Sequence, residues 1–148
     1  MTSDEVDAFE QEILADHPEW GIIARTAGLG YYDRSGQPMS LARWMASMEK
    51  DPESKIVAHN WFVHDGSIVL VSTVWLGMDH NFFSDSGPPI VFETMVFGLA
   101  DDEYQERYAT EEAALAGHDR ALALVRDWLP SCREVSEDEA RQMDEDNR

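Results

Sequence analysis

The residues best suited to acid–base or metal chemistry gather around one predicted loop in the middle of the chain. Asp79 and His80 follow a predicted strand, and Glu93 and His59 lie on strands that could neighbour this loop. Two carboxylates and two imidazoles can hold a divalent metal or act as an acid–base pair. We therefore take Asp79, His80, Glu93 and His59 as candidate catalytic residues, with His80 and Asp79 as the candidate metal ligands.

Asp79 and Glu93 also have a purely structural interpretation. Asp79 and Asn81 could bond backbone amides in a turn bounded by glycine and proline. Glu93 could pair with an arginine such as Arg25 or Arg107. The spacing matches no diagnostic metal motif, and the chain has no phosphate loop, dinucleotide fingerprint or HExxH motif. The sequence therefore predicts no cofactor and no metal, and an enzyme is the less favoured class.

Histidines on predicted core elements favour hydrogen bonding over chemistry. His59 would face Ser72 across a hairpin, and such a pair more often forms a satisfied core hydrogen bond. His118 lies on the apolar face of the last predicted helix, and the same interpretation applies. Cys132 is the only cysteine, so the chain can form no internal disulfide.

Aromatic and polar residues near the same loop, and on the following strand, are candidate contacts for a ligand or partner. This set consists of Trp75, Asn81, Phe82, Tyr104, Arg107 and Tyr108.

A β-hairpin over 55–76 is the clearest structural prediction. Two β-rich runs are joined by Asp65-Gly66, a strong signal for a two-residue turn. This turn fixes the register and places Ile56 opposite Trp75. Both faces of the hairpin are apolar, so we expect it to lie centrally, covered on both sides by helices, loops or a second copy.

The remaining patterns complete an α+β fold. They predict a strand over 90–98, an edge strand over 104–108, helices over 41–50 and 111–129, and an N-terminal helix. The sum is a central antiparallel sheet of about four to six strands packed with two or three helices.

The negative charge is concentrated at the two ends. Of the net −19, residues 1–19 hold −7 and residues 134–148 hold −5. We expect an acidic N-terminal helix over 1–19, one α+β domain over 20–133 and an acidic, flexible tail over 134–148. Phosphates and anionic lipids would repel such a chain, so direct nucleic-acid or membrane binding is not expected. With no secretory signal at the N-terminus, a cytoplasmic location is expected.

Four stretches together carry a family resemblance. Residues 72–82 read STVWLGMDHNF, 88–89 read PP, 92–97 read FETMVF and 104–110 read YQERYAT. They resemble a group of small uncharacterised proteins encoded by bacteriophages and prophages of actinobacteria, over about residues 30–128. The group carries no established activity, cofactor or substrate. The resemblance implies an accessory phage-type gene product acting inside a bacterial cell.

Three function classes follow from these observations. The favoured one is an acidic protein-binding or regulatory module acting on a host or phage protein, with an inhibitor or a nucleic-acid mimic as sharper versions. The second is a small enzyme or metal-binding protein with a site around Asp79, His80 and Glu93. The third is a homo-oligomeric structural or virion-associated protein, because a second copy could cover one face of the hairpin.

Overall fold

The computed structural model describes residues 2–16, 18, 30–81, 87–100 and 104–148. In chain order these residues form α1 (Ser3–Asp16), α3 (Leu41–Lys50), a 3-10 turn η1 (Pro52–Lys55), β1 (Ile56–His64), β2 (Ser67–Trp75), β3 (Phe92–Phe97), β4 (Tyr104–Tyr108), α4 (Glu111–Trp128), β5 (Arg133–Val135) and α5 (Glu137–Asp146). The strands make one antiparallel sheet in the order β4-β3-β2-β1-β5. The predicted α+β class is confirmed.

The β1–β2 hairpin forms as predicted, with one local difference in register. Asp65 and Gly66 both have positive φ, the conformation that a tight two-residue turn requires. Beyond the turn the expected pairs hold as far as Ala58, but Ile56 then pairs with Val74 and not with Trp75. A β-bulge between Ile56 and Ala58 inserts one extra residue and causes this shift.

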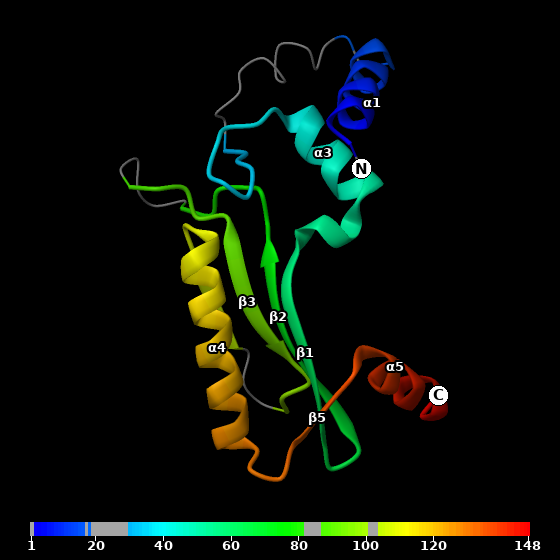
Figure 1. Cartoon of the computed structure of the whole chain (residues 1–148), viewed down its shortest axis with the longest axis vertical. Helices are drawn as coiled ribbons and strands as arrows, with labels where there is room; N and C mark the ends of the chain where they lie inside the picture. Colours follow the sequence, from blue (N-terminus) through cyan, green and yellow to red (C-terminus); the bar gives the residue numbers. More distant parts are fainter. Residues whose placement is uncertain (1, 17, 19–29, 82–86, 101–103) are drawn as a thin grey trace.

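One face of the sheet packs against α4, and we call it the helix face (Figure 1). Thr110 begins α4 by accepting a hydrogen bond from the backbone N–H of Ala113. Ala121 and Val125 of α4 then pack on sheet residues that alternate along the strands. These sheet residues are Phe62, Val69, Val71 and Val96, all buried. Alternate residues of the strands and residues four apart on α4 thus form one core.

A second cluster extends this core toward α3. Trp75 and Phe92 of the sheet are buried there, and Trp44 and Met48 of α3 pack against them. Ser40 begins α3 by accepting from the Arg43 N–H.

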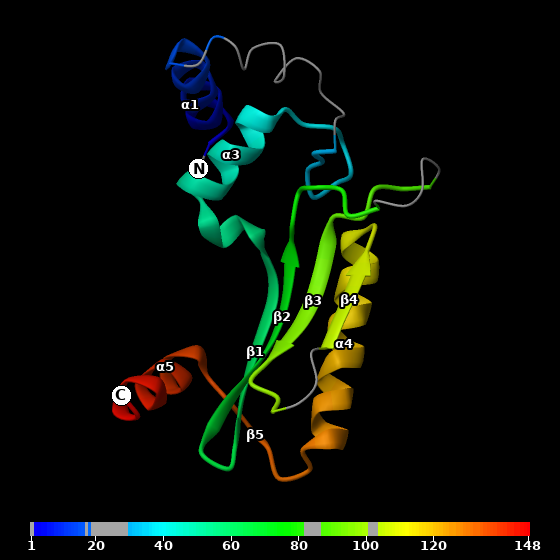
Figure 2. The same ribbon diagram turned by 180° about the vertical axis from the view of Figure 1, so that it is seen from behind.

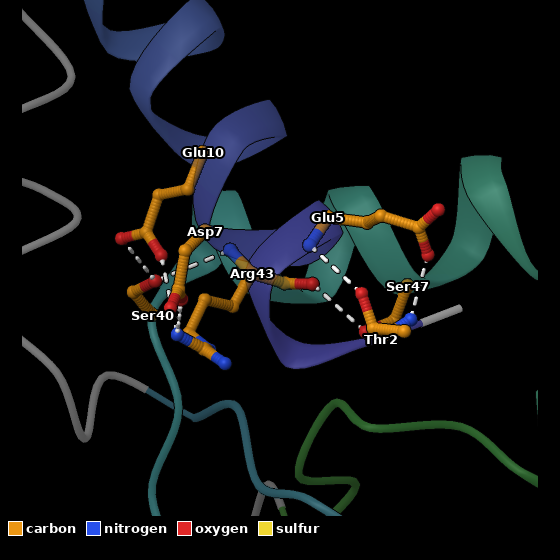
Figure 3. Close-up of polar contacts among 7 residues, drawn as sticks. All are labelled: Thr2, Glu5, Asp7, Glu10, Ser40, Arg43 and Ser47. Atoms are coloured by element: carbon orange, nitrogen blue, oxygen red, sulfur yellow. Dashed lines mark hydrogen bonds and ion pairs between the residues drawn. The ribbon is translucent and has the colours of Figure 1, made fainter.

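The acidic helix α1 is held by α3 (Figure 3). Arg43 of α3 forms ion pairs with Asp7 and Glu10 of α1. The Ser40 hydroxyl also donates to Glu10, and the Lys50 ammonium lies 4.6 Å from the centre of the Phe9 ring. The predicted N-terminal helix therefore docks on α3 through these ion pairs, the Ser40–Glu10 hydrogen bond and the contact of Lys50 with Phe9.

The C-terminal segment differs from the flexible tail expected over 134–148. Residues 133–135 form β5, which pairs with residues 61–63 of β1, and Ser136 caps a fourth helix, α5. Only Val135 and Ala140 bury apolar side chains there, so the segment has no hydrophobic pattern that a sequence could reveal. Backbone pairing with the edge of β1 orders it instead. Among the described helices, none has both the length and the apolar content needed to cross a membrane.

Candidate functional site

Asp79 serves as a cap for the loop between β2 and β3. Its Oδ1 accepts hydrogen bonds from the backbone N–H groups of Asn81 and Ile90, each at 2.8 Å. The neighbouring His80 donates from its backbone N–H to the Ile90 carbonyl, and its Nδ1 lies 2.8 Å from the Met78 carbonyl oxygen. These contacts join the two ends of the loop. The structural interpretation of Asp79 is confirmed.

Glu93 forms the arginine pair that the sequence offers as its structural alternative. Its Oε2 accepts from Arg107 Nε at 2.9 Å and from Gln105 Nε2 at 2.6 Å, both on the neighbouring strand β4. The other suggested partner, Arg25, lies outside the described residues. With only 8% of Glu93 exposed, these two donors satisfy the carboxylate in the sheet.

His59 forms the predicted bond with Ser72, and the sheet keeps it apart from Glu93. His59 Nε2 lies 2.9 Å from the Ser72 hydroxyl. Strand β2 separates β1, which carries His59, from β3, which carries Glu93. Within the described part of the chain, no three His, Cys, Asp or Glu side chains are grouped so that they could hold a metal ion.

His118 belongs to a continuous hydrogen-bonded chain through the core. Its Nε2 lies 2.7 Å from Asn60 Oδ1, which can only accept, so Nε2 carries the proton. Nδ1 then accepts from the Thr73 hydroxyl at 2.7 Å, and Thr73 accepts from Thr94 at 2.5 Å. Asn60 in turn donates to Glu134 of β5 at 2.6 Å. The predicted satisfied core histidine is confirmed, and the chain links α4, the sheet and β5.

Two of the candidate contact residues fill the core. Trp75 is 4% exposed, and its indole N–H donates to the Tyr32 carbonyl at 2.9 Å. Tyr108 is buried against Gly117 of α4, where an added Cβ would lie 2.0 Å from the Tyr108 hydroxyl oxygen. Burial is also the main cause that raises the pKa of Tyr108.

The other candidate contact residues take different positions. The Tyr104 hydroxyl donates to Glu106 at 2.8 Å, and burial, aided by this bond, raises the pKa of Tyr104 to about 12. Asn81 is held by its backbone bond to Asp79 and donates its side chain to the Pro88 carbonyl at 3.5 Å. Phe82 lies outside the described residues. The described members of this set are therefore not gathered around one site.

The sheet face opposite α4 has a different character, and we call it the open face. Alternation along the strands places nine apolar side chains on it. They are Ile56, Trp61, Val63, Ile68, Leu70, Val74, Met95, Phe97 and Val135. Val135 is buried, Phe97 is 47% exposed and the other seven are partly buried, whereas Phe62, Val69, Val71 and Val96 under α4 are all buried.

Helix α5 covers one end of the open face. Trp61 and Ile68 line a hollow of about 440 Å³ together with Ala140 and charged residues of α5 and the C-terminus. The indole N–H of Trp61 is shielded from solvent and has no hydrogen-bond acceptor among the described residues. The expected cover on both faces of the hairpin is thus complete under α4 and only partial under α5.

Two acidic helices lie toward opposite ends of the sheet. Figures 1 and 2 place α5 beside β1, and α1 against α3 beyond the other end of the sheet. Helix α1 carries six acidic and no basic side chains, and α5 carries six acidic side chains and one arginine.

The open face, and not the Asp79 loop, is therefore the surface best placed for function. The apolar pattern on both hairpin faces indicated such a surface, but which face the helices cover depends on the tertiary structure.

Comparison of the chain with family models, with curated proteins and with solved structures gives no match.

Proposed function

We propose that this protein is a protein-binding module that engages a basic partner protein through its open face. The observation that carries the proposal is the row of apolar side chains on β1, β2 and β3 that α4 does not cover, most of them partly buried and Phe97 exposed. Contiguous exposed apolar patches on soluble proteins mark interaction sites. In the phage-type context that the sequence resemblance implies, the partner is a host or phage protein that the module regulates.

The size of the open face suits a modest protein interface. Five strands about 4.8 Å apart and roughly 3.3 Å per residue give a surface of roughly 24 by 20–30 Å. The resulting area of about 500–700 Å² is somewhat below the ~800 Å² that each partner contributes to a standard interface. The adjoining surface of α5 adds to this area. Burial of the apolar centre supplies affinity, and the polar rim supplies specificity.

Charge favours a basic partner over a second copy. The chain carries a net charge of −19, and α5, which covers one end of the open face, carries six acidic side chains and one arginine. Two copies joined through this face would bring like-charged helices together, whereas a basic surface would be attracted and steered toward it.

Phe97 and Leu115 provide a matched pair for testing this proposal. Both side chains are 47% exposed, but Phe97 lies on the open face and Leu115 on α4. A random peptide library is selected on the wild-type protein, and the selected peptides are measured against Phe97→Asp and Leu115→Asp. We expect basic peptides with aromatic or aliphatic residues, at least tenfold weaker binding to Phe97→Asp, about 1.4 kcal/mol, and unchanged binding to Leu115→Asp.

Three outcomes contradict the proposal. Selection could recover no peptide, or peptides whose binding does not change with Phe97→Asp. Light scattering could instead show a dimer that Phe97→Asp dissociates, in which case the open face binds a second copy. Phe97→Gln, which adds no charge, separates loss of binding from loss of folding if Phe97→Asp lowers the unfolding temperature.

A further inference from the structure

We propose that the segment that docks on the open face is a basic amphipathic α-helix, an inference that rests on the proposed function. Its apolar stripe contacts the open face, and its Lys or Arg residues face α5.

The first argument is the hydrogen bonding of a docked backbone. The described polar groups at the centre of the open face already bond one another, as in the pairs of His59 with Ser72 and of Glu93 with Arg107. An extended segment lying across this face would lose water from its N–H and C=O groups without gaining partners. A helix satisfies its own backbone groups, so it can cover an apolar surface at no such cost.

The edges of the sheet do not offer an extended segment a better position. At the β1 edge, β5 already pairs with residues 61–63. At the other edge, β4 carries Glu106 and Arg107, and charges on an edge strand oppose the addition of another strand. Strand addition is therefore the less favoured mode.

The second argument is the way this sheet already binds a helix on its other side. Helix α4 lies along the helix face and buries Ala114, Ala121 and Val125 against the strands. The open face has the same strands and the same alternation of side chains, and on it α5 covers only the end near Trp61 and Ile68. A helix has a diameter of about 10 Å, so one fits on the remaining width.

The third argument is charge. Many acids of α1 and α5 form ion pairs within the protein, for example Asp7 with Arg43 and Glu137 with Arg141. Among the described residues, Glu145 of α5 takes part in no ion pair, and it lines the hollow beside Trp61 and Ile68. Its carboxylate is available to a basic side chain of a docked helix.

Two model peptides of one composition test the inference. In the first, equal numbers of Leu and Lys follow the helical period as LKKLLKKLKKLLKL; in the second they alternate, which is the strand period. Binding of each labelled peptide is measured by fluorescence anisotropy. We expect the helical-period peptide to bind and become helical by circular dichroism, and the alternating peptide to bind at least tenfold more weakly.

Protein variants then place the site. We expect Phe97→Asp to weaken binding of the helical-period peptide at least tenfold, and Leu115→Asp to leave it unchanged. Glu145→Lys on α5 should weaken binding several-fold at low salt, whereas Asp127→Lys, the same charge change on the exposed side of α4, should not.

The outcomes separate this inference from the proposed function. If the alternating peptide binds as well as the helical-period one, and Phe97→Asp weakens it, the helix inference is wrong and the protein-binding function stands. If the helical-period peptide binds equally to Phe97→Asp and Leu115→Asp, attraction between net charges explains its binding, and the helix inference is wrong. If library peptides are also insensitive to Phe97→Asp, both proposals fail.

Discussion

Replacing Gly98 with alanine is expected to lower the free energy of unfolding by about 3 kcal/mol. Gly98 follows β3 with a φ of +96°, and an added Cβ would lie 2.1 Å from the Ile68 carbonyl oxygen and 3.2 Å from Val69 Cα. These are backbone atoms of β2, so no rotation of a side chain can relieve the overlap. Urea unfolding followed by circular dichroism measures the change.

Gly36→Ala is the matched control for this prediction. Gly36 has a similar φ of +87°, but an added Cβ would meet no atom within 4 Å. Its replacement should cost only the strain of a left-handed backbone, about 1–2 kcal/mol. If the two variants lose the same stability, overlap with the β2 backbone does not add to the cost of replacing Gly98.

Acidification below pH 6.5 is expected to destabilise the protein through His59 and His118. Burial is the main cause that lowers the pKa of each, and the charge of His59 lowers the pKa of His118 further. Above pH 6.5 both are neutral in the folded and unfolded states. Below it the unfolded chain binds protons that the folded protein does not. The free energy of unfolding therefore falls by up to about 1.4 kcal/mol per pH unit for each histidine, until the folded pKa is reached.

His59→Gln isolates one of these contributions. Glutamine keeps a hydrogen-bonding group for Ser72 but does not titrate. The unfolding free energy of the variant should therefore fall less steeply between pH 6.5 and 5 than that of the wild type. Equal slopes would show that the pH dependence comes from carboxylates and not from His59.

The parts of the fold that could be predicted from the sequence are those with local signals. Asp65-Gly66 specified the hairpin, and Thr110 with its following apolar stripe specified α4. The bulge after Ile56 had no such local signal. The strand β5 also escaped prediction, since its order comes from pairing with a strand about seventy residues earlier in the chain.

The candidate site was predicted in part for the same reason. The pairs of Glu93 with Arg107 and of His59 with Ser72 follow from strand register, which a two-residue turn and a short connection fix. The partners of His118 come from two other elements, and sequence spacing does not connect them. The sequence also showed that both hairpin faces are apolar, but only the position of the helices decides which face stays open.

The most direct test of the binding claim is the NMR signal of the Met95 methyl group, labelled with carbon-13, during titration with the helical-period peptide. Met95 lies on the open face, whereas Met48 of α3 packs against the core cluster around Trp75 and Phe92. We predict that the Met95 signal shifts on saturation and that the Met48 signal stays in place. A peptide that binds without moving the Met95 signal would contradict binding at the open face.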